Sequence, residues 1–100
     1  MKLVDNAALR KIAEGVVWFH EPETTLRDPR LFLSHVMRYG TLEDVLVTSQ
    51  YFSDADYHEI LKNPPEGLFD ERSWYFWHIR LGVNPISNLP VMRTITESEP

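Results

Sequence analysis

The chain has 100 residues, of which 43% are hydrophobic and 25% charged, and its formal net charge is -5. This length suits one domain, because two cores would leave about 50 residues each, and the composition is that of a folded globular protein rather than a disordered or fibrous one. The sequence has no cysteine, which excludes disulfide scaffolds, thiolate metal sites and thiol catalysis.

The amino-terminal third predicts one helix followed by a loop. Asp5 or Asn6 can cap a helix that carries apolar residues at helical spacing as far as Val16. The β-branched and aromatic run 16–20 either finishes this helix or forms a short extended piece. We expect the polar stretch 21–27 to be a loop in both cases.

Two helices joined by a tight corner are predicted next. Asp28-Pro29 is a helix start, because Asp accepts hydrogen bonds from free backbone N–H groups and Pro lacks the N–H that would go unused. The helix should reach Tyr39 and end at Gly40, the residue that most readily takes the left-handed conformation of a C-terminal cap. Thr41 then caps another helix. Its expected inner stripe consists of Leu42, Val45, Leu46 and Ser49 or Gln50.

Two further helices complete the predicted set. Ser53 is a hydroxyl N-cap for a helix over 54–62, which the following pair of prolines ends. Asp70 caps a last helix over 71–81, and Gly82 closes it. The aromatic run in this last helix makes it the expected centre of the core. One of its faces should hold Trp74, Trp77, His78 and Leu81, and the adjoining face Tyr75 and Ile79.

These elements predict an all-α fold, a single small bundle of about five short helices. The helical domain is expected to span residues 1–82, with residues 28–82 as its best-defined part. Residues 83–100 contain three prolines with scattered Ser, Thr and Asn, and are predicted to form an extended or mobile tail.

Negative charge is concentrated in the middle of the chain. Residues 1–40 carry six basic and five acidic side chains, whereas residues 41–71 carry eight acidic side chains and one lysine. Acids in the first turn of a helix stabilise its dipole, which explains much of this pattern without a partner. The functional interpretation is an anionic face that docks a basic protein surface. The partner-binding candidates are Glu43, Asp44, Asp54, Asp56, Glu59, Asp70 and Glu71.

No pattern for catalysis, a cofactor or a metal stands out. The histidines His20, His35, His58 and His78 lie on four separate segments, without the HxxxH or HExxH spacing of a metal site. Ser34 and His35 offer a nucleophile and a base, but the side chains of adjacent helical residues diverge by about 100°. Phosphate-binding glycine loops and the GxSxG motif are missing from the sequence. We therefore predict a protein that is not an enzyme and holds no cofactor or metal.

A helix-turn-helix DNA-binding regulator is a competing interpretation of the corner at residues 40–41. The recognition helix would cover residues 42–50, which begin with Glu43 and Asp44 after the leucine and contain no Lys or Arg. Two carboxylates would then face the phosphates, which disfavours nucleic acid as a partner.

The hydropathy pattern also bears on location. No apolar run approaches the roughly 20 residues that cross a bilayer, and the first 15 residues lack an apolar core of signal-peptide length. With the lack of cysteine, these features predict a cytoplasmic protein with no membrane partner.

Three stretches of the second half carry a resemblance to a known family. Residues 36–45 read VMRYGTLEDV, residues 60–63 read ILKN, and residues 68–82 read LFDERSWYFWHIRLG. Together they resemble small helical antitoxin-like proteins that are encoded beside nucleotidyltransferase toxins of the AbiEii class, over about residues 30–82. The resemblance implies a non-enzymatic protein that binds and neutralises a partner protein, such as a cognate toxin of that class. A general protein-interaction or structural module of another system stays open as the alternative.

Overall fold

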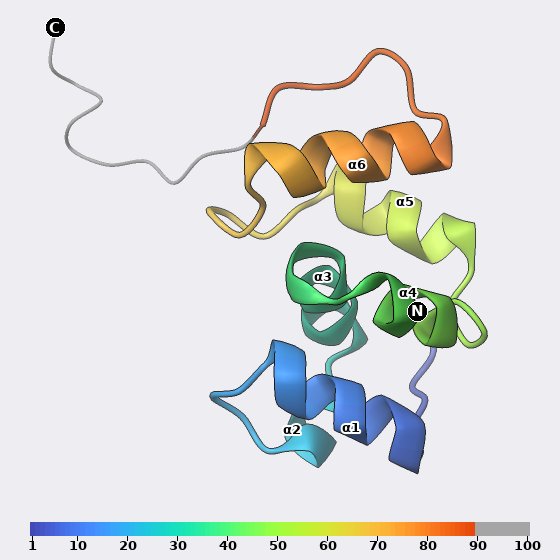
Figure 1. Cartoon of the computed structure of the whole chain (residues 1–100), viewed down its shortest axis with the longest axis vertical. Helices are drawn as coiled ribbons and strands as arrows, with labels where there is room; N and C mark the ends of the chain where they lie inside the picture. Colours follow the sequence, from blue (N-terminus) through green and yellow to red (C-terminus); the bar gives the residue numbers. More distant parts are fainter. Residues whose placement is uncertain (90–100) are drawn as a thin grey trace, which may run out of the picture.

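Six helices follow one another along residues 1–89, the part of the chain that this computed structural model describes, and no strand occurs among them (Figure 1). The helices are α1 (Ala7–Val16), α2 (Pro22–Leu26), α3 (Pro29–Tyr39), α4 (Leu42–Thr48), α5 (Asp54–Lys62) and α6 (Glu71–Leu81). α3 contacts each of the other five, with α1 and α2 on one side and α5 and α6 on the other. The predicted all-α bundle is confirmed, with one helix more than the five expected.

The additional helix is α2, so the prediction of a loop over residues 21–27 was wrong. Pro22 occupies its first turn, where the missing N–H costs nothing. Thr25 and Leu26 are buried, and α2 packs on α1 and α3. A helix this short is not stable by propensity alone, and burial of its last turn stabilises it.

The other helices begin where their polar caps predicted. The Asn6 side chain accepts a hydrogen bond from the Leu9 N–H at 2.9 Å, and the Asp28 side chain accepts one from the Leu31 N–H at 3.2 Å. α4, α5 and α6 each begin with a reciprocal capping box. Local side-chain chemistry therefore sets these boundaries.

The corner between α3 and α4 differs from the prediction. Gly40 has φ -70° and ψ 154°, which is extended backbone rather than the expected left-handed conformation. A Cβ at this position would lie 2.7 Å from the Val36 carbonyl oxygen and 3.3 Å from the Asp44 Cβ. The chain therefore needs a glycine here mainly because a Cβ would collide with the backbone of the last turn of α3, and the first turn of α4 also lies close. Gly82, with φ 70°, does take the left-handed conformation predicted for it.

The prediction that α6 is the centre of the core was wrong: within residues 1–89 the central helix is α3, which packs on all five others, whereas α6 packs on α3 and α5. α6 does bury its two tryptophans, as expected. The side chains of Trp74 and Trp77 are 2% and 1% exposed. The Trp77 ring stacks on the Tyr57 ring of α5 with 4.7 Å between centroids, and its Nε1–H donates to the Met37 carbonyl oxygen of α3 at 2.9 Å. One side chain thus joins three helices.

The predicted inner stripe of α4 was right for Val45 and wrong for Leu42 and Leu46. Val45 and Thr48 are buried, whereas Leu42 and Leu46 are 61% and 54% exposed. The side of α4 that faces α1 and α3 passes through residues 45 and 48, which leaves the row of residues 42 and 46 in solvent.

Residues 83–89, here called the strap, run back along α6 (Figure 1). The Trp74 Nε1–H donates to the Ser87 carbonyl oxygen at 2.8 Å. The His78 Nδ1–H donates to the Trp74 carbonyl oxygen at 2.8 Å, so His78 Nε2 accepts from the Ser87 hydroxyl at 3.2 Å. This part of the predicted tail is extended and attached to the bundle, and the predicted tail over residues 90–100 lies outside the described residues. No helix within residues 1–89 has the length and apolar character needed to span a membrane.

Candidate functional site

Three of the seven candidate acids form hydrogen bonds at helix starts. Asp44 accepts from the Thr41 N–H at 3.0 Å, and Asp56 accepts from the Ser53 N–H at 2.9 Å. Asp70 is the N-cap of α6. These acids have a structural role, in agreement with the capping interpretation of the sequence.

The other four candidate acids project into solvent. They are Glu43, Asp54, Glu59 and Glu71. Two ion pairs occur among residues 1–89, Arg10 with Asp5 at 2.7 Å and Arg38 with Asp70 at 3.6 Å, and neither involves these four. Their negative charges are therefore open to a partner.

Hydrogen bonding at the start of α6 changes the acidity of Asp70. The Ser73 hydroxyl and the Ser73 N–H both donate to its carboxylate, the latter at 2.9 Å. These two donors, with a smaller contribution from the charge of Arg38, lower the pKa of Asp70 below its usual value of 3.8. The charged form of Asp70 is thus the form that stabilises the fold.

We expect Asp70→Ala to lower the free energy of unfolding by about 1 kcal/mol at pH 7, the usual cost of losing an N-cap. Because the folded-state pKa is lowered, this stabilisation is present above pH 3.8 and is lost as the pH falls through the folded-state pKa. Urea unfolding of both proteins at neutral and acidic pH measures the difference. Asp54→Ala removes an acid with no capping bond and should cost less; an equal cost would contradict the capping role.

The candidate acids do not all gather on one side of the molecule. Figure 1 places the beginning of α5 and the beginning of α6 at opposite sides of the view. The acids at these two starts therefore lie apart, as expected for adjacent helices that run in opposite directions. Glu43 and Asp44, on the first turn of α4, do lie beside another helix, because they face α1 across a groove.

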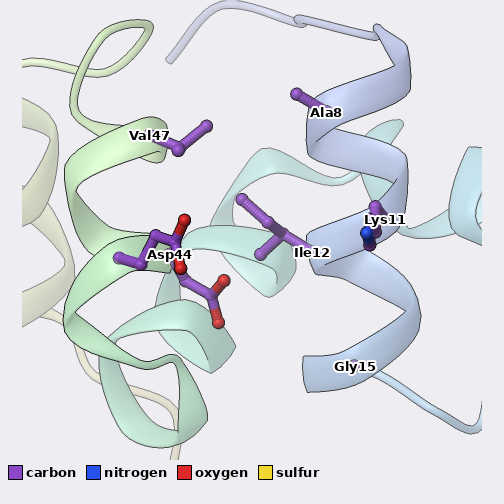
Figure 2. A pocket seen from close by; sticks show the side chains of 7 residues that line it. Ala8, Lys11, Ile12, Gly15, Asp44 and Val47 are labelled. Atoms are coloured by element: carbon purple, nitrogen blue, oxygen red, sulfur yellow. The ribbon is translucent and has the colours of Figure 1, made fainter.

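A groove of about 380 Å³ separates α4 from α1, and Figure 2 shows the side chains along it. The Asp44 carboxylate faces the gap from α4, and Ile12 points into it from α1 (Figure 2). The lining residues are Ala8, Lys11, Ile12 and Gly15 of α1, and Glu43, Asp44 and Val47 of α4. Helical spacing places each set along one face of its helix. We call this feature the α1–α4 groove.

The α1–α4 groove combines an apolar floor with an excess of negative charge, since two carboxylates and one lysine line it. Ile12 is 8% exposed and Val47 is partly buried, so the floor is apolar. Lys11 also lines the groove but forms no ion pair with either carboxylate. Gly15 has open space where a Cβ would stand.

In the described part of the chain, the histidines do not combine into a metal site or a catalytic pair. Within residues 1–89 no three His, Asp or Glu side chains are placed to hold a metal ion. The His35 Nδ1–H donates to the Leu31 carbonyl oxygen at 2.8 Å, and the Ser34 hydroxyl donates to the same oxygen at 3.1 Å. Ser34 and His35 therefore share a backbone acceptor, and the Nδ1 that lies 3.5 Å from the Ser34 hydroxyl is not free to act as its base.

An aromatic cluster is the feature that the sequence did not predict. Trp18 and Phe19 follow α1, and their rings meet the rings of His35 and Tyr39 on α3. Trp18 is 64% exposed and Tyr39 43%. The aromatic run at residues 16–20 was a visible signal, but its contact with α3 depends on tertiary packing.

Comparison of the chain with protein-family models, with curated proteins and with solved structures gave no match.

Proposed function

We propose that this protein is a non-enzymatic antitoxin-like protein, which binds and neutralises a partner protein through a basic surface of that partner. The cognate partner would be a nucleotidyltransferase toxin, and both would meet in the cytoplasm. The observation that carries the proposal is the α1–α4 groove, where the carboxylates of Glu43 and Asp44 stand over an apolar floor and form no ion pair, although Lys11 lines the same groove.

The lining of the groove suits the end of a lysine or arginine side chain. Such a side chain has an apolar stem and a charged end, so the stem can pack over Ile12 and Val47 while the charge meets the carboxylates. Glu43 has no ion-pair partner, and Asp44 uses its Oδ2 for the Thr41 N–H, which leaves Oδ1 for a ligand. An arginine could bind two carboxylate oxygens at once.

The remaining exposed acids support the same partner chemistry at longer range. Residues 41–71 carry seven more negative than positive charges. Such a field speeds the encounter with a basic protein and orients it, and salt weakens the effect. The expected association rate therefore falls as ionic strength rises.

Co-expression with the protein encoded by the neighbouring open reading frame tests the proposal. We expect the two proteins to co-purify, and we expect this chain to restore the growth that the neighbour alone inhibits. Failure both to bind and to rescue would sink the antitoxin proposal. Binding without any toxicity of the neighbour would instead favour a general interaction module.

Glu43→Lys should weaken binding to that partner by about tenfold or more, because it places a cation where the partner's cation would sit. Isothermal titration calorimetry measures the change. Glu43 makes no hydrogen bond or ion pair within the described residues, so the variant should fold normally.

Glu23→Lys is the matched control for this variant. It makes the same change in net charge at an exposed position of α2, outside the acidic region 41–71. Equal weakening by both variants would show that total charge matters and that the α1–α4 groove is not the contact.

A further inference from the structure

Four aromatic rings form a closed circuit on the surface near α2 and α3. Ring centroids are 5.5 Å apart for Trp18 and Phe19, 5.8 Å for Phe19 and His35, 6.0 Å for His35 and Tyr39, and 5.6 Å for Tyr39 and Trp18. We call these four residues the aromatic circuit. Within this set each ring therefore contacts two others, and Phe19 also contacts the His20 ring, with 4.8 Å between centroids.

Two elements build the aromatic circuit. His35 and Tyr39 are four residues apart, so they lie on one face of α3. Trp18 and Phe19 lie in the connection between α1 and α2, two short helices that both pack on α3. This packing brings the connection beside the carboxyl-terminal half of α3.

One ring of the aromatic circuit is buried, and the other three are exposed to solvent. His35 is 9% exposed, whereas Trp18 is 64%, Phe19 53% and Tyr39 43% exposed. The His35 ring is fixed by its hydrogen bond to the Leu31 carbonyl oxygen. Burial lowers the pKa of His35 from its usual value, so the base of the circuit is a neutral aromatic ring at pH 7.

The rings are steeply inclined to one another where they contact Trp18. The interplanar angle is 89° between Trp18 and Phe19 and 77° between Trp18 and Tyr39. Rings inclined at such angles can present their faces to one cation, and the face of an aromatic ring carries negative potential.

We propose that the aromatic circuit is a binding site for a compact organic cation of the alkylammonium class. One of its rings already has a cation in contact, since the Arg38 guanidinium carbon lies 4.6 Å from the Tyr39 centroid. The same guanidinium also pairs with Asp70 at 3.6 Å and donates to the Leu68 carbonyl oxygen. Its charge is thus partly balanced. Within residues 1–89 no Lys or Arg lies over the Trp18 or Phe19 ring, and the His20 ring lies 4.8 Å from that of Phe19.

The shared chemistry is an alkylammonium group, which a free small molecule or a methylated lysine side chain can supply. Aromatic walls are the usual means of binding either. This site does not depend on the proposed antitoxin function, because it lies outside the α1–α4 groove and uses none of the candidate acids.

Titration of the isolated full chain with choline chloride tests the site, with sodium chloride at equal ionic strength as the baseline. The readout is the set of tryptophan indole N–H signals in a ¹H–¹⁵N spectrum. The indole N–H groups of Trp74 and Trp77 are hydrogen bonded inside the protein. We expect the Trp18 signal to shift in a saturable way while the other two stay unchanged.

A neutral isostere of choline, 3,3-dimethyl-1-butanol, separates cation binding from binding of an apolar group. We expect this alcohol to bind at least several-fold more weakly. Equal binding of the alcohol and choline would overturn the proposal, as would the lack of any Trp18 shift. A peptide with trimethyllysine, compared with the same peptide carrying lysine, shows whether a protein side chain can supply the alkylammonium group. Binding of the trimethyllysine peptide that is tighter than that of choline favours a protein side chain as the ligand. Weaker binding favours a free small molecule.

Tyr39→Leu should weaken choline binding by about two- to fivefold, the loss expected for one cation–π contact at an exposed site. Tyr75→Leu is the control, because Tyr75 is also an exposed helical tyrosine, 48% against 43%, and lies outside the aromatic circuit. Unchanged binding in Tyr39→Leu, or equal loss in both variants, would show that the circuit is not the site.

Discussion

Trp77→Ala should lower the free energy of unfolding by about 3–5 kcal/mol, the range for removing a buried tryptophan or phenylalanine. The side chain is 1% exposed, and its loss would leave a cavity between α3, α5 and α6. The variant also loses the stacking with Tyr57 and the hydrogen bond to the Met37 carbonyl oxygen, which lie on two different helices. Chemical denaturation followed by circular dichroism measures the effect.

Phe76→Ala is the neighbouring control. Phe76 is 44% exposed, although its ring also contacts Trp77 with 5.5 Å between centroids. Its replacement should cost much less than the replacement of Trp77, because water already reaches much of its surface. A loss below about 1 kcal/mol for Trp77→Ala would place this side chain at the surface and contradict the packing described above.

Gly40→Ala should destabilise the protein by about 1–3 kcal/mol, the usual cost of forcing extra volume into a packed site. The new Cβ would lie 2.7 Å from the Val36 carbonyl oxygen and 3.2 Å from the Val36 Cγ1. The oxygen belongs to the backbone of α3, so it cannot rotate away, and the corner into α4 must open. Urea unfolding gives the free energy.

Gly15→Ala makes the same chemical change where there is room. A Cβ at residue 15 meets no atom within 4 Å, and the residue is helical. Alanine is favoured over glycine in a helix, so this variant should be more stable by about 0.5–1 kcal/mol. Changes of the same sign in the two variants would show that close approach is not the reason for glycine at residue 40.

Helix starts could be predicted from the sequence because their causes are local. A side-chain oxygen that reaches the backbone N–H two or three residues ahead leaves a clear pattern, as at Asn6, Asp28 and Asp70. The buried face of α6 was equally clear, since Trp74 and Trp77 are too large and apolar for a solvent-facing helix.

Tertiary contacts decided what the sequence could not show. Leu42 and Leu46 have the spacing of a core stripe, but α4 faces its neighbours through Val45 and Thr48. A seven-residue helix with apolar side chains on more than one side fits several orientations, and only the neighbours choose among them. α2 was missed for the same reason, because its burial against α1 and α3 stabilises it.

Some features of the candidate site could also be predicted from the sequence, and others depend on tertiary packing. The excess of acids over residues 41–71 is a property of the sequence, and so is the capping role of Asp44, Asp56 and Asp70. That Glu43 and Asp44 stand across a groove from α1 follows from packing between distant segments. The aromatic circuit likewise joins residues 18–19 to residues 35 and 39, which only the fold brings together.

The strap also makes hydrogen exchange at the tryptophan rings informative about separate motions. The Trp74 indole proton is held by the Ser87 carbonyl oxygen, so it exchanges with solvent when the strap detaches from α6. The Trp77 indole proton is held by α3, and its exchange requires α6 to separate from that helix. Because Trp74 and Trp77 lie on the same helix, the ratio of their exchange rates measures the free energy of detaching the strap relative to that of opening the core.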